Sequence, residues 1–197
     1  MSEQHVDTGR RRFLTVATSA VGGVAAAGVA VPFLMSFAPS ERAKAAGAPV
    51  EVDISKLEPG QKINVEWRGK PVWVLSRTPE QLKNLATIEG ELLDPKSESP
   101  EQPAYCKNAT RSIKPEILVA VGICTHLGCS PTHRPDLAPA DLGPKWVGGF
   151  YCPCHGSKFD ISGRVYKNVP APTNLSVPPY QFVTDTRILI GAEKGNA

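Results

Sequence analysis

The sequence predicts a mainly β protein, an antiparallel β-sandwich or barrel, preceded by one N-terminal transmembrane helix. Residues 13–40 contain no charged side chain, and a helix of about 20 apolar residues is long enough to cross a bilayer. Beyond Pro49, short strand-like runs alternate with turn residues, a pattern typical of small antiparallel sheets. The 197 residues suffice for one domain of about 100 to 150 residues and this appendage.

The N-terminal region divides into a tail, an anchor and a tether. We expect a cytoplasmic tail over 1–12, a transmembrane anchor over 13–39 and a flexible tether over 40–49. The run Arg10-Arg11-Arg12-Phe13-Leu14 resembles a twin-arginine export signal, although three arginines before an ordinary anchor also fit the positive-inside rule. Both interpretations leave the N-terminus in the cytoplasm. Ala43-Lys44-Ala45 resembles a cleavage site, but we expect the anchor to be retained.

The domain over 50–197 is predicted from local turn and strand signals. Arg68-Gly69-Lys70 separates two strand-like runs and therefore predicts a hairpin. Thr78-Pro79-Glu80-Gln81 has an N-cap residue, a proline at the first helical position and a glutamine at the third, so a short helix is expected to begin there. Residues 86–111 lack periodicity and predict a long loop. The expected strands lie at 62–67, 71–75, 117–123, 180–183 and 187–190.

Composition excludes several classes of protein. A net charge of +3 gives no broad basic surface, so nucleic acid is not an expected partner. The hydrophobic fraction of 41% argues against disorder, and five cysteines are too few for a disulfide-scaffold miniprotein. Most of these cysteines lie between residues 124 and 155, together with three of the four histidines. Clustering of cysteine with histidine predicts a metal site.

Two loops carry this cluster: C-T-H-L-G-C at 124–129 and C-P-C-H-G-S at 152–157. Each loop has two cysteines and one histidine, whereas a zinc ion takes four ligands and leaves two of the six over. A two-iron cluster with two cysteine and two histidine ligands accounts for all six, because the other two cysteines can form a disulfide. With two thiolates rather than four, the oxidised two-iron centre is neutral, so it accepts an electron more easily.

These loops resemble those of the Rieske iron–sulfur proteins, and the run at 111–117 is similar to that of the quinol:cytochrome c reductase subunit. The resemblance implies an antiparallel β-sandwich Rieske domain with a small cluster-binding subdomain and one [2Fe–2S] cluster per chain. It further implies that Cys124 and Cys152 bind the buried iron, that His126 and His155 bind the outer iron, and that Cys129 and Cys154 form a disulfide.

The resemblance also implies a function. The chain is expected to be one subunit of a bacterial ubiquinol:cytochrome c reductase, an oxidoreductase and translocase of the respiratory chain. It would take electrons from ubiquinol and pass them to a c-type cytochrome, coupled to proton release, with His155 and His126 as the catalytic residues. The implied partners are a cytochrome b subunit, a c-type cytochrome subunit, ubiquinol and the lipid bilayer. The implied setting is a dimeric complex of the bacterial inner membrane, with the Rieske domain in the periplasm.

Two alternatives are compatible with the same loops. The small Rieske subunit of a periplasmic molybdenum oxidase such as arsenite oxidase can share the export signal and both motifs, and it relays electrons without touching quinol. A zinc-stabilised or disulfide-only binding domain is the alternative from a different class. Three features favour the quinol enzyme. They are the retained anchor, the run Lys114-Pro115-Glu116 on the approach to the first loop, and Leu127 between the expected ligands.

Three further residues are expected to tune or contact the site. Ser157 matches a hydroxyl that, in the family, donates to a cluster sulfur, and Phe159 stands where many members have tyrosine. Leu127 is expected to contact the quinone-binding partner. Outside the loops, Cys106 is expected to be buried and inert, and His133 to be a surface residue without a ligand role.

Overall fold

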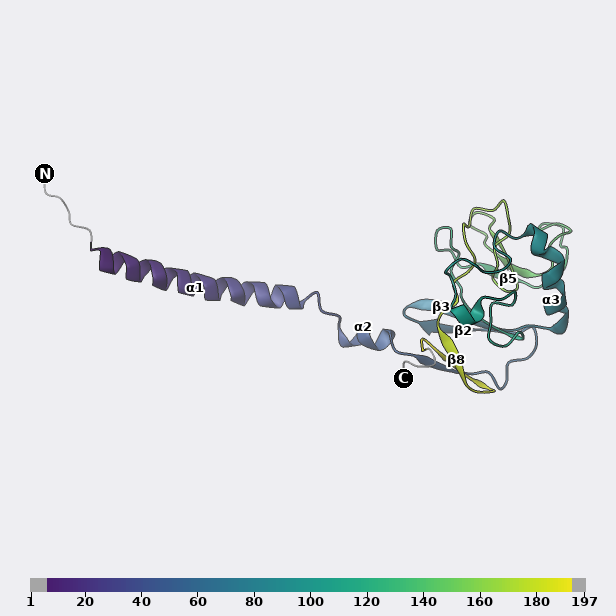
Figure 1. The fold of residues 1–197 in the computed structure, drawn as a ribbon, viewed down its shortest axis with the longest axis horizontal. Helices are drawn as coiled ribbons and strands as arrows, with labels where there is room; N and C mark the ends of the chain where they lie inside the picture. The colour runs from purple at the N-terminus through teal and green to yellow at the C-terminus, as the bar shows by residue number, and fades with distance from the viewer. Residues whose placement is uncertain (1–6, 193–197) are drawn as a thin grey trace. The chain divides into compact units, whose positions relative to one another are not determined.

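The computed structural model describes residues 7–192 (Figure 1). The chain divides into two compact units, Met1–Ala45 and Ala46–Ala197, and each is described by itself. Residues 1–6 of the predicted tail and 193–197 of the predicted domain lie outside the described residues.

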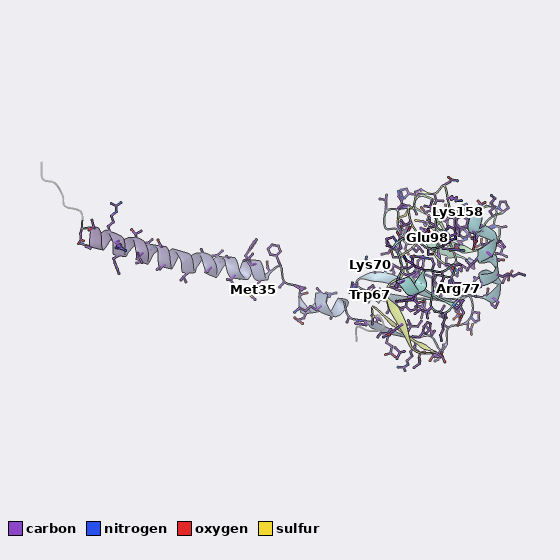
Figure 2. All side chains as sticks on the ribbon, in the orientation of Figure 1. Met35, Trp67, Lys70, Arg77, Glu98 and Lys158 are labelled. Carbon is purple, nitrogen blue, oxygen red and sulfur yellow. A yellow bond between two sulfur atoms is a disulfide. The ribbon has the colours of Figure 1, made fainter. Side chains whose placement is uncertain are left out.

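The first unit consists mainly of the apolar helix α1, Thr8–Met35. The helix begins earlier than the predicted anchor because the Asp7 side chain caps it, accepting hydrogen bonds from the backbone N–H groups of Gly9 and Arg10 at 3.0 and 3.1 Å. No residue of α1 is buried, and its side chains project from all sides of the helix (Figure 2). The helix is long and apolar enough to cross a membrane, so it fits the predicted anchor.

The predicted tether contains a short helix, α2, Glu41–Ala46. The Ser40 hydroxyl accepts a hydrogen bond from the backbone N–H of Ala43 at 3.2 Å, and Lys44 pairs with Glu41 at 2.7 Å. The alanine-rich composition of the segment favours this helix. Part of the tether is therefore helical, and its flexibility stays a prediction.

The second unit contains three antiparallel sheets of three strands each, with strand orders β1-β9-β8, β2-β3-β4 and β5-β6-β7. This confirms the prediction of a mainly β, antiparallel domain. The strands are β1 Val50–Asp53, β2 Lys62–Trp67, β3 Lys70–Ser76, β4 Ile117–Val121, β5 Thr132–Arg134, β6 Gly149–Tyr151, β7 Lys158–Asp160, β8 Tyr180–Thr184 and β9 Arg187–Ile190.

The predicted hairpins and the predicted short helix are present. Strands β2 and β3 join through Arg68 and Gly69, which both have positive φ angles, 52° and 69°. Helix α3, Pro79–Asn84, begins with the expected capping box, in which Thr78 and Gln81 exchange hydrogen bonds. The region predicted to be a long loop instead includes two short 3₁₀ helices, η1 (Leu85–Glu91) and η2 (Ala104–Cys106).

The hydrophobic core extends directly beneath the two cysteine loops. Trp73 of β3 stacks on Phe150 of β6 with ring centroids 4.6 Å apart, and these rings belong to the same buried cluster as Cys124 and Cys152. Gly122 lies between β4 and the first loop, where an added Cβ would clash with the Trp73 ring. The close packing of this ring therefore fixes the point at which the first loop leaves the sheet.

Candidate metal centre

The first loop, 124–129, closes on itself through two backbone hydrogen bonds. The N–H of Cys124 donates to the carbonyl of Cys129 at 2.7 Å, and the N–H of Gly128 donates to the carbonyl of Cys124 at 3.0 Å. Gly128 has a φ of 87°, a conformation that glycine adopts without strain. The strand β4 delivers this loop, since it ends at Val121 and is buried along its whole length.

The second loop, 152–157, repeats this backbone design. The N–H of Cys152 donates to the carbonyl of Ser157 at 2.8 Å, and the N–H of Gly156 donates to the carbonyl of Cys152 at 3.0 Å. Gly156 also has a positive φ, 77°. Our sequence reasoning missed these glycines, although both motifs carry glycine at the fifth position. The repetition shows that each loop is built to turn sharply and return its last residue to the first cysteine.

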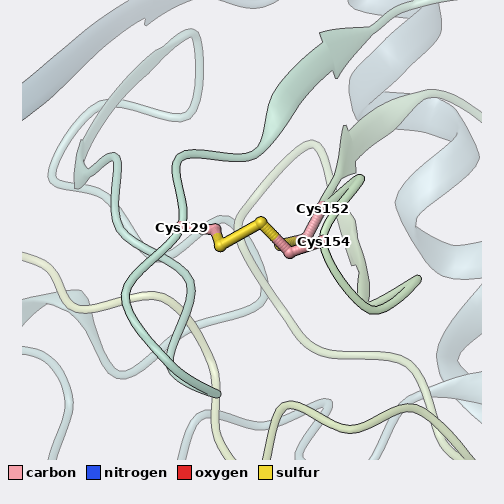
Figure 3. Close-up of side chains that lie close together, drawn as sticks. All are labelled: Cys129, Cys152 and Cys154. Atoms are coloured by element: carbon pink, nitrogen blue, oxygen red, sulfur yellow. A yellow bond between two sulfur atoms is a disulfide. The ribbon is translucent and has the colours of Figure 1, made fainter.

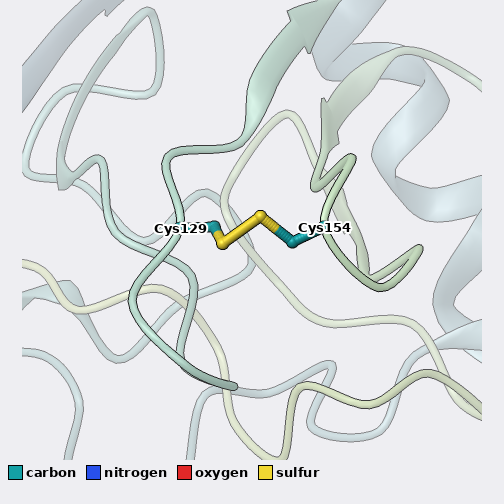
Figure 4. The surroundings of a disulfide bond; sticks show 2 residues. All are labelled: Cys129 and Cys154. Carbon is teal, nitrogen blue, oxygen red and sulfur yellow. A yellow bond between two sulfur atoms is a disulfide. The ribbon is translucent and has the colours of Figure 1, made fainter.

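The four loop cysteines divide into two pairs, as the family resemblance implied. Cys129 and Cys154 form a disulfide that links the two loops (Figure 4), with Cα atoms 6.7 Å apart. Cys124 and Cys152 are free thiols and are almost completely buried, 2% and 1% exposed. Burial raises the pKa of the Cys152 thiol, and the adjacent Cys124 thiol raises it further. Binding of a metal ion would therefore release a proton here.

The two loop histidines lie next to each other. The rings of His126 and His155 have centroids 4.8 Å apart and are nearly perpendicular, at 88°. His126 is half-buried, whereas His155 is exposed. The Nδ1 atom of His126 is buried and, within the described part of the chain, has no hydrogen-bond partner. A partnerless buried ring nitrogen is compatible with a metal ligand but does not identify one, because Nε2 of His133 is also buried without a partner in the described residues.

A different group of sulfur atoms is more compact but cannot be the metal site. The Sγ atoms of Cys129, Cys152 and Cys154 all lie within 4.8 Å of one another (Figure 3). Two of these sulfurs are bonded to each other, so they offer no thiolate to a metal. The donor set that fits a Rieske cluster is instead the two free thiols of Cys124 and Cys152 with the imidazoles of His126 and His155.

A third segment covers the two loops. Ser157 is fully buried, and its Oγ atom accepts a hydrogen bond from the backbone N–H of Ala171 at 3.0 Å. This bond does not use the hydroxyl hydrogen, and donation by Ser157 to a cluster sulfur stays a prediction. The Thr125 hydroxyl of the first loop donates to the carbonyl of Thr173 at 2.7 Å. Both loops are thus held against the proline-containing segment at 169–174.

The remaining predicted residues take different positions. Leu127 is 71% exposed in the first loop, and its contact with a partner stays a prediction. Cys106 is buried, as expected, with its sulfur 3.9 Å from the Tyr180 hydroxyl. His133 lies in β5 opposite Phe150 and is half-buried, so the prediction of a surface residue is wrong. Burial lowers the pKa of its imidazole.

Phe159→Tyr is expected to raise the reduction potential of the cluster. Phe159 is fully buried in β7 and packs in the same core cluster as Cys124 and Cys152. A tyrosine would add a hydroxyl donor toward the sulfur atoms, which carry more negative charge in the reduced state. One hydrogen bond of about 1 kcal/mol corresponds to a shift of about 40 mV for a one-electron couple.

A redox titration of the reduced-cluster resonance measures this shift. Ser157→Ala is the matched control, because it should lower the midpoint by removing the hydroxyl that the native chain already has. An unchanged or lowered midpoint in Phe159→Tyr would contradict the prediction.

Comparisons with known proteins show the family of the chain. Residues 1–40 match the family described as "Ubiquitinol-cytochrome C reductase Fe-S subunit TAT signal", and residues 49–181 match the "Rieske [2Fe-2S] domain". The chain is 62% identical to the ubiquinol-cytochrome c reductase iron-sulfur subunit of Allochromatium vinosum, over 100% of this chain and 95% of that one. It is 44% identical to the subunit of the same name from Blastochloris viridis, over 97% of each chain.

Among solved structures, a chain of a hyperthermophilic respiratory Complex III matches with 26% identity and a TM-score of 0.46. That match covers 88% of this chain and 98% of the other.

Sequence, fold and loop pair together define a Rieske iron–sulfur protein. Its full-length relatives show further that the chain belongs to the family of ubiquinol-cytochrome c reductase iron-sulfur subunits. It is thus an electron-transport oxidoreductase subunit with a Rieske-type [2Fe–2S] cluster and a twin-arginine signal. These matches favour the quinol enzyme over the molybdenum-oxidase relay.

Proposed function

We propose that this chain oxidises ubiquinol at a membrane site and passes the electron to a c-type cytochrome. The observation that carries this proposal is the pair of adjacent imidazoles, 4.8 Å apart, of which His155 is exposed. Cys124 and Cys152 would hold the cluster on its buried side, and His126 and His155 on the outer side. When bound, the cluster supplies a one-electron acceptor.

His155 would bind and orient the quinol. An imidazole that binds iron through one ring nitrogen keeps the other nitrogen for a hydrogen bond or a proton. On the exposed ring of His155, this second nitrogen can accept a hydrogen bond from a quinol hydroxyl and then hold its proton. His126 lies beside it and, because it is half-buried, would contribute less to contact with the quinol. Proton release then follows from the exposure of His155 to solvent.

The apolar Leu127 supports docking of this end of the domain on a partner. It is 71% exposed, whereas the neighbouring Cys124 is buried, so the loop presents its leucine outward. Burying a leucine side chain against a partner contributes about 1.5 to 3 kcal/mol. We propose that the partner is the cytochrome b subunit, which holds the quinol, within a dimeric complex that also contains a c-type cytochrome.

The N-terminal unit supports a proposal for where the protein lies in the cell. Arg10, Arg11 and Arg12 lie at the N-terminal end of α1, just before its uncharged stretch, and the positive-inside rule places such arginines in the cytoplasm. A single span then puts the Rieske domain on the opposite side, the periplasm, with α1 in the inner membrane. Disulfide formation between Cys129 and Cys154 is also favoured in that oxidising compartment.

Purification of the full chain from membranes tests the function. We expect a cytochrome b to co-purify, and we expect added short-chain ubiquinol to reduce the cluster. Leu127→Ala should lower the rate of this reduction by about tenfold or more, because the variant loses the leucine side chain that would be buried against the partner. The cluster resonance should stay unchanged. Leu137→Ala is the matched control, because Leu137 is also exposed, at 53%, but lies outside both loops.

Two results would overturn the proposal. One is co-purification of a molybdenum subunit together with reduction of the cluster by arsenite and not by ubiquinol. The other is an equal loss of ubiquinol oxidation in Leu127→Ala and Leu137→Ala, which would place the docking surface elsewhere.

A further inference from the structure

A free thiol lies against the disulfide that links the two loops. The Sγ atom of Cys152 is within 4.8 Å of both sulfurs of the Cys129–Cys154 bond (Figure 3). Thiol–disulfide exchange requires a thiolate that can reach a disulfide sulfur, and it proceeds without a net change of oxidation state. The described chain has two other free thiols, Cys106 and Cys124, but neither belongs to this close group of sulfur atoms.

We propose that Cys152 exchanges with this disulfide whenever the cluster is absent, so that the chain acquires a Cys129–Cys152 bond. The thiolate of Cys152 attacks Sγ of Cys129, the Cys129–Cys152 bond forms, and the Cys129–Cys154 bond breaks. Cys154 leaves as a thiolate and takes up the proton that Cys152 released. The step needs no oxidant or reductant, because one disulfide replaces another.

The surroundings of the sulfurs favour Cys154 as the leaving group. Cys154 is exposed, so water stabilises the thiolate that forms there, and a better-stabilised thiolate leaves faster. Attack on Cys154 would instead close a small ring through Pro153, whose fixed φ angle leaves the backbone little freedom to adopt disulfide geometry. Cys129 lies on the other loop and has no such restriction.

The exchange would make cluster loading a condition for the native disulfide. This step of the inference rests on the proposed function, in which Cys152 is a cluster ligand. A sulfur bound to iron is not free to attack, so the cluster would lock the Cys129–Cys154 pairing. After exchange, a cluster ligand is held in a disulfide and an exposed thiol takes its place, so this form of the chain must exchange back before it can be loaded.

Disulfide mapping of the full-length protein in detergent tests this inference. The cluster is removed with a chelator under oxygen-free, non-reducing conditions, free thiols are alkylated, and peptides are sequenced by mass spectrometry. Cleavage of the backbone between Cys152 and Cys154 shows which of the two carries the label. We expect loss of the Cys129–Cys154 linkage, gain of Cys129–Cys152 and alkylation of Cys154, with the native linkage intact in the loaded protein.

Two variants serve as controls. Cys152→Ser lacks the attacking sulfur and should keep the Cys129–Cys154 linkage in the absence of a cluster. Cys106→Ser removes a buried thiol that packs in a separate core and should exchange as the native chain does.

Retention of the native linkage in the cluster-free wild-type chain would overturn the inference. So would a Cys124–Cys152 bond beside an intact Cys129–Cys154 bond, because a second disulfide forms by oxidation and not by exchange. Failure of the ligand assignment has a different signature, namely a Cys152→Ser protein that still shows the cluster resonance.

Discussion

In a His155→Ala variant, the low-temperature resonance of the reduced two-iron cluster is expected to disappear, while the chain stays in the membrane fraction. The site offers two adjacent imidazoles, and removing one leaves a three-ligand site open to water. Membrane attachment should be unchanged because it depends on α1, which belongs to a separate compact unit. Electron paramagnetic resonance of reduced membranes and an immunoblot of the same fraction measure the two effects.

His133→Ala is the matched control for this experiment. His133 lies between the two loops in the sequence, but its ring packs 5.5 Å from Phe150 in the β5-β6-β7 sheet. We therefore expect this variant to keep the resonance. A normal spectrum in His155→Ala would remove His155 from the ligand set, and loss of the resonance in both variants would show that the effect is not specific to the ligand.

The chemistry of the site was predictable because the two motifs are local. The residues in 124–129 and 152–157 are adjacent in sequence, and each loop closes through its own backbone hydrogen bonds. The disulfide partners and the division of ligands came only from the family resemblance, since spacing alone does not say which cysteine is free. Nδ1 of His126 is buried without a hydrogen-bond partner among the described residues because of the way the loops fold against the core. No local sequence pattern encodes that arrangement.

The fold was predictable where short-range signals dominate. The turn at Arg68-Gly69 and the capping box at Thr78 are each defined within a few residues, and both are present. The strands β5, β6 and β7 were not predicted, because three residues are too few to show an alternating pattern. The pairing of β1 with β9 joins the two ends of the domain and has no local signature.

Buried charges are the other feature that the sequence hides. Arg77, Arg111 and Arg164 are 2% exposed or less, although charged residues are normally assigned to the surface. Burial lowers the pKa of Arg77 and of Arg111 to about 10, and the carboxylate of Asp160 opposes this change in both. A single buried carboxylate therefore offsets part of the effect of burial on both guanidinium groups.

The carboxylate of Asp160 accepts three hydrogen bonds at the centre of this group. Its Oδ2 atom accepts from Nε of Arg164 at 2.7 Å, and both side chains are completely buried. Its Oδ1 atom accepts from the backbone N–H groups of Ser162 and Arg164 at 2.9 and 2.8 Å. The carboxylate thus stabilises both the turn that follows β7 and the charge of its neighbours.

Asp160→Asn is therefore expected to lower the free energy of unfolding by about 3 to 5 kcal/mol, the effect of leaving a buried charge without its partner. Urea unfolding of the detergent-solubilised protein measures this change. Glu91→Gln breaks the exposed pair with Lys145, also at 2.7 Å, and should lower the free energy by less than about 1 kcal/mol. Equal effects of the two substitutions would mean that the buried guanidinium groups are held by their backbone carbonyl and hydroxyl partners alone, without a contribution from the charge of Asp160.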